Sequence, residues 1–281
     1  MLIYRFKNRN EFEEHLIKQD DALRQRHLDL TKMEEKNANQ SFTLKAFSIT
    51  AGKSVKLAVD WAYANGKHIN WRERLICPIT NLNNRQRACY HLFLSDLHPY
   101  AGDSVYITEQ VSPFYDFLME RVPGLIGSEY VDTNLEPGEV SESGLRHEDF
   151  TNLSFEDGSV DKIMSFDCLE HIPNYKKAVT ESCRVLKENG RALFSFPFSN
   201  DLDQTLVRAT VSENGVISHL TEPEYHGDPL SNDGCLSYYT FGWDILDTFR
   251  DAGFKEVSAL IYWSDIFGYL GNEQIVFLAK K

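Results

Sequence analysis

The stretch LSFEDGSVDKIMSFDCLEHIPNYKKAVTESCRVLKENGRALFSFPF, residues 153–198, decides the fold of this chain. Its two apolar runs, VDKIMSF (160–166) and RALFSFPF (191–198), are typical of buried strands. Between them, NYKKAVTESCRVLKENG (174–190) has helical spacing, and Gly190 is the expected C-terminal stop of the helix. A helix between two buried strands indicates a βαβ unit with parallel strands.

The same alternation continues on both sides of this unit. We expect further strands at 104–108, 125–131 and 144–150, and helices at 112–122 and 242–254. EVSALIYW and QIVFLAKK predict two final strands. The chain is therefore predicted to have an α/β fold with a mostly parallel sheet, whose ligand lies at the carboxyl ends of the strands.

Composition narrows the class of protein. The 281 residues are 42% hydrophobic and 25% charged, which is ordinary for a globular chain, and the net charge is −13. An acidic chain lacks the clustered Lys and Arg of a nucleic-acid interface, and no apolar stretch is long enough for a membrane partner. The first residues, MLIYRFKNRNEFEEH, do not form a secretory signal, and five widely spaced cysteines indicate no disulfide framework. We therefore expect a cytoplasmic protein.

Four successive predicted strands present an acidic residue at the same edge: Glu109 follows the first, Glu129 ends the second, Asp149 ends the third and Asp167 follows the fourth. Each one alone is explained by the preference of turns for Asp and of surfaces for Glu. Because the carboxyl ends of parallel strands meet at one edge, the four together predict a crevice lined with acids. Carboxylates there need donors such as ribose hydroxyls, an exocyclic amine or an ammonium group.

Residues 153–198 resemble the second half of the class I S-adenosylmethionine-dependent methyltransferases, of the methyltransferase type 11-like kind. The segments LSF (153–155), LEH (169–171) and RVLK (184–187) match the family's pattern and spacing. The resemblance covers about residues 103–281. It implies a Rossmann-like sheet of seven strands with the last one antiparallel, methyltransferase activity, and S-adenosylmethionine as the cofactor.

The resemblance also implies site residues. Glu129 matches the acid that accepts from both ribose hydroxyls, and Asp149 matches the acid that accepts from the adenine amino group. The remaining cofactor-binding residues implied in this way are Tyr130 and Val131 beside the adenine, the backbone N–H of Phe150 at the ring, and Asp167 near the methionine end.

The first loop departs from the family pattern, because no glycine lies between Asp103 and Gly124. Glu109 is either the acid of the first motif, with Gln110 in the place of the first glycine, or itself occupies that place. A nicotinamide dehydrogenase is disfavoured, since its pyrophosphate needs backbone N–H groups at close range. Glu109 and Gln110 are candidate cofactor-binding residues: a side chain at either position would fill the methionine pocket or would form a hydrogen bond with the ammonium group of the cofactor.

Asp-x-x-Glu-His at 167–171 offers metal-ligating residue types. On a strand-to-helix turn, however, Glu170 and His171 are adjacent and expected to point apart, unlike zinc ligands spaced by three or four on a helix. We therefore expect no metal, and His171 is a candidate catalytic base. His226, in the long connection 199–241, is the second candidate base, because this connection is expected to form the acceptor site.

The N-terminal part is predicted to extend the fold. Residues 1–40 form a helical segment, with one or two amphipathic helices in 9–36 that serve packing or a homodimer. Residues 41–102 form a small β-hairpin and helix module. In it, FSITAG (47–52) and LICPITN (75–81) resemble the two knuckles of a zinc ribbon that has kept only Cys77 of its thiols. Residues 103–281 form the methyltransferase-like domain.

The expected function is methyl transfer from S-adenosylmethionine to a small-molecule or carbohydrate-like acceptor, at oxygen or nitrogen. The first alternative is a catalytically inactive module of the same fold, which the glycine-free loop favours. A nicotinamide-dependent oxidoreductase is more remote.

Overall fold

The computed structural model describes residues 1–64, 66–132, 134–228, 230–231 and 233–281. Within these ranges, no helix has both the length and the apolar character required to cross a bilayer. The chain forms two compact units. Unit 1 comprises Met1–Phe6, Asn10–His98 and Leu260–Ile275, and unit 2 comprises Lys7–Arg9, Pro99–Ala259 and Val276–Lys281.

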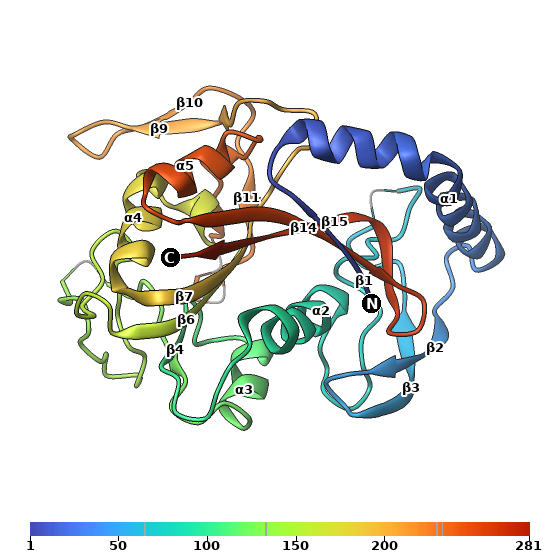
Figure 1. Ribbon diagram of the computed structural model, residues 1–281, viewed down its shortest axis with the longest axis horizontal. Coiled ribbons are helices and arrows are strands. Elements are labelled where there is room, and N and C mark those ends of the chain that lie inside the picture. Colours follow the sequence, from blue (N-terminus) through green and yellow to red (C-terminus); the bar gives the residue numbers. More distant parts are fainter. Residues whose placement is uncertain (65, 133, 229, 232) are drawn as a thin grey trace. The chain divides into compact units, whose positions relative to one another are not determined.

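A seven-stranded mixed sheet is the central feature, with strand order β1-β14-β15-β7-β6-β4-β5 (Figure 1). Its parallel part pairs β4 with both β5 and β6, and β6 with β7, whereas β15 runs antiparallel to β7. The predicted α/β class with an antiparallel last strand is confirmed. The strands are β1 (Leu2–Phe6), β4 (Val105–Ile107), β5 (Ile126–Gly127), β6 (Val160–Phe166), β7 (Leu186–Ser195), β14 (Glu256–Ser264) and β15 (Tyr269–Lys280).

Three helices of unit 2 connect these strands: α3 (Pro113–Met119), α4 (Tyr175–Val185) and α5 (Ile245–Asp251). Helix α3 begins where the sequence signals it, because Ser112 accepts from the Tyr115 amide and Pro113 occupies the first turn. Helices α4 and α5 lie side by side against the sheet (Figure 1). Their buried residues, such as Val179 and Phe249, supply one side of the core.

Two predictions about elements are wrong. The expected strand at 144–150 is reduced to isolated bridges, among them Glu129 with His147 and Asp149 with Asn152. The backbone turns there because the Asp149 carboxylate accepts from the amide and the hydroxyl of Thr151. An N-terminal strand, β1, which the sequence reading did not assign, brings the sheet to seven strands.

Gly190 is not the stop of helix α4. The helix ends at Val185 and β7 begins at Leu186, so Gly190 lies inside the strand. A Cβ atom at Gly190 would stand 2.7 Å from the carbonyl oxygen of Lys187 and 3.2 Å from that of Asp161. Glycine is needed at this position because the backbone of neighbouring segments approaches closely. The sequence predicted a helix stop instead, because Gly190 stands at the end of a helical pattern.

The predicted insertion 199–241 consists of short antiparallel pairs. They are β8 (Leu206–Val207) with β13 (Tyr239–Thr240), β9 (Ala209–Val211) with β10 (Ile217–His219), and β11 (Tyr225–His226) with β12 (Cys235–Leu236). The β9–β10 hairpin projects from unit 2 (Figure 1). Ala209, Leu236 and Tyr238 form a small core within the insertion. The Tyr238 amide donates to the Glu170 carbonyl at 2.7 Å.

Unit 1 holds most of the long helix α1 (Arg9–Lys36), the hairpin of β2 (Phe42–Ser48) and β3 (Lys53–Val59), and helix α2 (Asn84–Leu92), which continues into a π-helical turn (Phe93–Leu97). Its core surrounds Leu57, Leu75 and Trp71. The buried Glu34 carboxylate ties α1 to this core, since it accepts from the Ile69 amide and the Trp71 indole.

The two predicted knuckles of unit 1 do meet. The Ser48 hydroxyl lies 3.4 Å from the Cys77 sulfur and 2.9 Å from the Thr50 hydroxyl, which lies 3.1 Å from that of Thr80. Polar side chains thus contact one another between the two segments. The relationship to zinc-ribbon modules and the domain boundaries at residues 40 and 102 stay predictions.

Gly127, at the end of β5, provides a test of how tightly the edge of the sheet is packed. A Cβ atom there would stand 2.7 Å from the carbonyl oxygen of Glu109 and would overlap the Tyr115 ring. Gly127→Ala is therefore expected to lower the free energy of unfolding by about 1–3 kcal/mol, because the crowded backbone must shift. Urea denaturation measures this change.

Gly227→Ala is the matched control, because a Cβ atom at Gly227 would meet no atom within 4 Å. We expect its effect to stay within about 0.5 kcal/mol. Equal stability of the Gly127 variant and the wild type would contradict the packing seen at this edge.

Candidate active site

The parallel register brings three strand ends of unit 2 to one edge. Ile107 of β4 pairs with Met164 of β6, and Phe166 at the end of β6 pairs with Ser195 of β7. The segments that follow these strands therefore leave the sheet at the same edge, which we call the rim. The predicted cofactor residues follow strands or bridges that end there.

Glu129 is held by the first loop. Its Oε1 atom accepts from the backbone amides of Gln110 at 2.6 Å and Val111 at 2.8 Å. Burial raises the pKa of Glu129, while these two amides oppose the shift and the charge of Asp228 adds to it. The other carboxylate oxygen, Oε2, makes no hydrogen bond with the described residues, so one acceptor atom is left for a ligand.

The Gln110 side chain links the first loop to the segment after residue 143 by hydrogen bonds; we call this link the strap. Its side-chain oxygen accepts from the Arg146 amide at 2.8 Å, and its side-chain nitrogen lies 3.4 Å from the Gly144 carbonyl. In a glycine-containing loop no side chain is available for these bonds. The Gln110 side chain therefore fixes the first loop to its neighbour.

Tyr130 lies beside the rim with 59% of its surface exposed. Its ring stands 5.1 Å from the ring of His147, and His147 Nδ1 accepts from the Val131 amide at 3.1 Å. The buried imidazole thus fixes the backbone on which Tyr130 is carried. An exposed aromatic ring held in this way provides a flat apolar surface of the type that stacks against a planar ligand.

Asp149 and Phe150 belong to the turn that replaces the predicted third strand. The Asp149 Oδ1 atom accepts from the amide and hydroxyl of Thr151, at 2.7 and 2.8 Å. Its Oδ2 atom makes no hydrogen bond with a described residue. Phe150 is buried at 6% exposure, so its side chain packs in the core, while its backbone contact with the adenine stays a prediction.

Asp167 follows β6 with a left-handed backbone, at φ 49°. Its amide donates to the Ser195 carbonyl at 2.7 Å, and its Oδ1 atom accepts from the Ser195 hydroxyl at 3.0 Å. Asp tolerates this conformation better than most residues, and such positions gather at functional sites. Glu109 follows β4 at the same rim and is half-buried.

The two candidate bases are brought together. His226 Nδ1 lies 3.2 Å from His171 Nε2, across 55 residues of sequence. Glu170 stands beneath them, 0% exposed, with Oε1 at 3.6 Å from His171 Nε2 and 3.4 Å from His226 Nδ1. The prediction that Glu170 and His171 point apart is wrong, because residues 169–171 form a tight 3₁₀ turn.

Burial raises the pKa of Glu170. Contact with Glu170 raises the pKa of His226 to about 9, with burial opposing the shift and Glu224 adding to it. At 3.4 Å the contact is a charge interaction, since neither Glu170 oxygen has a hydrogen-bond partner among the described residues.

Three groups that form hydrogen bonds with the candidate site residues were not identified from the sequence. The Leu236 carbonyl accepts from His171 Nδ1 at 2.8 Å, and Glu224 Oε1 accepts from His226 Nε2 at 3.1 Å. The Ser195 hydroxyl donates to Asp167. A backbone carbonyl gives no sequence signal, whereas the Glu-x-His spacing of 224–226 on a short strand does place both side chains on one face.

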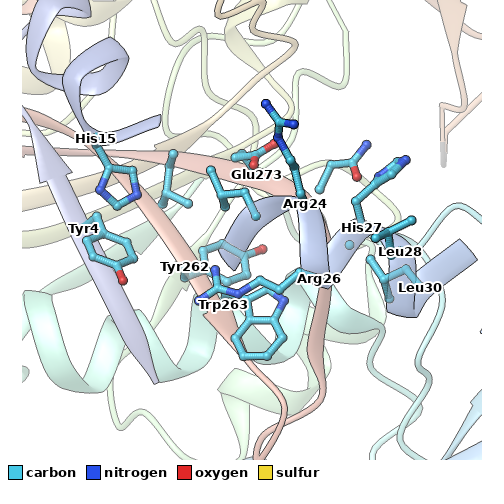
Figure 2. A pocket seen from close by; sticks show the side chains of 14 residues that line it. Tyr4, His15, Arg24, Arg26, His27, Leu28, Leu30, Tyr262, Trp263 and Glu273 are labelled. Atoms are coloured by element: carbon cyan, nitrogen blue, oxygen red, sulfur yellow. The ribbon is translucent and has the colours of Figure 1, made fainter. Parts of the chain in front are cut away.

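A cavity of about 500 Å³ lies in unit 1, between α1 and strands β1, β14 and β15 (Figure 2). Its walls are mainly apolar, and the Arg26 guanidinium stands 4.2 Å from the centre of the Trp263 ring. None of the predicted cofactor or catalytic residues lines it. Its volume is within the range of small-molecule sites, but the paired imidazoles and the buried carboxylate are in unit 2.

The strap made by Gln110 is open to a direct test. Gln110→Ala removes the acceptor of the Arg146 amide, which is worth about 1 kcal/mol. Hydrogen exchange of the Arg146 amide, followed by NMR, is expected to become about fivefold faster, because local opening costs less.

Gln86→Ala serves as the control, because Gln86 caps helix α2 in unit 1 and makes no bond to the first loop. It is expected to leave the exchange of Arg146 unchanged. An Arg146 amide that exchanges at the same rate in Gln110→Ala would show that the strap does not hold the loop in solution.

Comparison with known proteins agrees with the fold. Residues 119–194 match the family model described as a methyltransferase domain. No curated protein matches the chain. Among solved structures, the chain is similar to a putative methyltransferase in complex with the Trm112 methyltransferase activator from Haloferax volcanii, at 15% identity and TM-score 0.43, over 70% of this chain and 90% of that one.

Two further similar structures are methyltransferases by name. One is a putative S-adenosylmethionine-dependent methyltransferase from Listeria monocytogenes, at 12% identity and TM-score 0.40, covering 69% of this chain and 99% of that chain. The other is 1,6-didemethyltoxoflavin-N1-methyltransferase from Burkholderia thailandensis, with 1,6-didemethyltoxoflavin and S-adenosylhomocysteine bound, at 16% identity and TM-score 0.36, covering 70% and 77%. Such distant likenesses decide nothing about substrates or partners. The match to the methyltransferase family model covers residues 119–194 of this chain.

Proposed function

We propose that the chain is an S-adenosylmethionine-dependent methyltransferase that acts on a small polar acceptor at oxygen or nitrogen. The observation that carries the proposal is the rim of unit 2. There, inside the segment that matches the family model, Glu129 keeps one carboxylate oxygen for a ligand beside the exposed Tyr130 ring. An acid next to an exposed aromatic ring suits a nucleoside, with the sugar hydroxyls on the acid and the base on the ring.

The sulfonium group of the cofactor makes the transfer itself simple. The acceptor atom forms a bond to the methyl carbon, the carbon–sulfur bond breaks, and its electron pair returns to sulfur as a neutral thioether. Alignment of the two reactants supplies much of the acceleration. A hydroxyl acceptor must also lose its proton, and the pair of His171 and His226 lies beside the segment that follows β6, where it can receive a proton.

The insertion supplies the acceptor side. Its strand β11 carries His226, and the Tyr238 amide anchors it to the turn that carries His171. The exposed Tyr225 and the half-buried Asp228 lie on the same segment. Aromatic and carboxylate groups around a histidine suit a hydroxyl-rich acceptor, including a carbohydrate-like one.

An inactive module of the same fold is the alternative that one observation favours. Glu129 Oε1 is already occupied by the chain's own amides, so a loop without glycines partly satisfies the ribose-binding acid. Titration calorimetry with S-adenosylmethionine, S-adenosylhomocysteine and NAD separates the possibilities. Binding of the first two supports the methyltransferase, binding of none supports the module, and binding of NAD alone supports an oxidoreductase.

Glu129→Gln tests the ribose contact without opening the loop. The amide oxygen of Gln can still accept from Gln110 and Val111, but the other oxygen becomes an NH₂ group that cannot accept from a hydroxyl. We expect the dissociation constant of S-adenosylhomocysteine to rise at least about tenfold, roughly 1.4 kcal/mol, as measured by calorimetry.

Glu142→Gln is the matched control, because Glu142 is exposed and lies in the same part of unit 2. It should bind like the wild type. Equal affinities of all three proteins would remove Glu129 from the cofactor site.

A homodimer through helix α1 is also proposed. The helix exposes Ile17 at 77% and Leu28 at 51% of their surfaces, and apolar side chains at such positions are available for a second copy. Sedimentation of the wild type should show a dimer that Ile17→Glu dissociates. A monomeric wild type at high concentration would refute this assembly.

A further inference from the structure

The starting point is the buried Glu170 carboxylate. Glu170 has no exposed surface, and neither of its oxygens has a hydrogen-bond partner among the described residues. Burying a carboxylate costs several kcal/mol unless a positive charge or several donors compensate. The groups that face it most closely are ring nitrogens of His171 and His226. The positive charge that offsets the burial of the carboxylate must therefore lie on or between these side chains.

The outer contacts of the two imidazoles fix which nitrogens carry hydrogen. His171 Nδ1 lies 2.8 Å from the Leu236 carbonyl, which can only accept, so Nδ1 carries the hydrogen. His226 Nε2 lies 3.1 Å from the Glu224 carboxylate, so Nε2 carries the hydrogen there. In the neutral rings, His171 Nε2 and His226 Nδ1 therefore present lone pairs toward each other.

The three inner atoms form a nearly regular triangle. The distances are 3.2 Å between the two ring nitrogens, 3.4 Å from His226 Nδ1 to Glu170 Oε1, and 3.6 Å from His171 Nε2 to Glu170 Oε1. Two lone pairs and a carboxylate oxygen at such distances repel one another unless a positive particle stands between them. A proton can bridge one pair of these atoms and leaves the third atom without a donor.

A tetrahedral metal ion satisfies all three atoms. With bonds of about 2.0–2.1 Å to nitrogen and oxygen, neighbouring ligand atoms of a zinc site stand about 3.3–3.4 Å apart. The three distances lie around this value. The outer contacts also fit, because metal-bound histidines donate their other N–H to a carbonyl or a carboxylate, as His171 and His226 do.

We propose that Glu170, His171 and His226 bind a divalent metal ion of the zinc class, with Leu236 and Glu224 orienting the two imidazoles. Three protein ligands leave a fourth position open, as in catalytic rather than structural zinc sites. The inference departs from the expectation of no metal, which considered only the spacing within 167–171. His226, 55 residues further along the chain, completes the site.

The open fourth coordination position of the metal ion indicates which class of acceptor would bind there, and this inference rests on the proposed methyl transfer. A metal ion held by Glu170, His171 and His226 would bind a hydroxyl oxygen of the acceptor and lower its pKa, so that the proton would leave to solvent and the oxygen would attack the methyl carbon as the carbon–sulfur bond breaks. With the inner nitrogens bound to metal, the histidines act through the ion rather than as proton acceptors. The acceptor atom is then oxygen.

Metal binding is measured on the untagged full-length chain, first freed of metal by a chelator. Titration with Zn²⁺ against a chromophoric chelator should give one site per chain, and Co²⁺ should give the visible absorption bands of a tetrahedral site. Glu170→Gln and His226→Ala should each weaken Zn²⁺ binding at least about a hundredfold, because each removes a ligand. Glu224→Gln should weaken it about tenfold, because it removes only the orienting charge.

His219→Ala is the matched control, since His219 is exposed on the neighbouring strand β10. It should bind Zn²⁺ like the wild type. A wild type without the site, or Glu170→Gln and His226→Ala variants that keep wild-type affinity while their thermal unfolding is unchanged, would overturn the proposal. If Glu170→Gln does not fold, the Glu224→Gln result decides in the same way.

Calorimetry with S-adenosylhomocysteine on the same preparations keeps the two proposals separate. Metal binding without cofactor binding would leave the metal site standing and refute the methyltransferase function. Cofactor binding with no metal site would do the reverse. Mg²⁺ and Mn²⁺ should bind more weakly than Zn²⁺, because two imidazole ligands favour the later metal.

Discussion

The parallel pairing of β4, β6 and β7 is the constraint on which the rest of unit 2 depends. Its register sets Ile107 against Met164 and Phe166 against Ser195, so the chain leaves all three strands at one edge. The strands themselves are buried and carry little polar chemistry. Everything polar must therefore be supplied by the segments that follow, and Asp167 with its left-handed backbone turns the chain at this edge toward Glu170 and His171.

The first loop shows how a chain can keep this architecture without the glycines of the family pattern. Glycines would leave backbone amides open toward a ligand, whereas here two of them donate to Glu129 and the Gln110 side chain holds the Arg146 amide. The loop is therefore preorganised by the protein rather than by a ligand. Preorganisation lowers the cost of ordering on binding, but it also commits one oxygen of the acid that a nucleoside would use.

Much of the fold was predictable because its strands are short apolar runs. Strand β6 spans Val160–Phe166, as VDKIMSF indicated, and β14 and β15 follow the two final apolar segments. The end of α4 was not predictable, since the helical pattern up to Gly190 competes with a strand whose pairing with β6 begins at Leu186. Tertiary pairing overrides local propensity there. The strand predicted at 144–150 does not form, because the hydrogen bond between the Asp149 carboxylate and the Thr151 hydroxyl turns the backbone.

Part of the site was predictable from the sequence, namely the residues that the order of the strands places. The contact between His171 and His226 was not, because these residues are 55 positions apart in the chain. Glu129 and Asp167 follow strands β5 and β6, so the topology places them, whereas Asp149 lies in a turn; the resemblance to the family pattern names all three. Their roles toward a cofactor stay predictions. The meeting of His171 with His226 depends on the insertion, which is held at this turn by bonds from the Tyr238 amide to the Glu170 carbonyl and from His171 Nδ1 to the Leu236 carbonyl. Neither periodicity nor motif spacing contains such bonds.

Glu170 explains why the insertion must dock at this place. A carboxylate with no exposed surface destabilises unit 2 unless positive charge reaches it, and the insertion delivers His226 to within 3.4 Å. A protonated His226 provides that charge, but its hydrogen can bridge only two of the three inner atoms, His226 Nδ1, His171 Nε2 and Glu170 Oε1. A metal ion provides twice the charge, and its bonds use the inner lone pair of each imidazole. Because the two outer N–H groups are already committed to Leu236 and Glu224, both inner nitrogens are directed at one point, and that convergence fits an ion better than a proton.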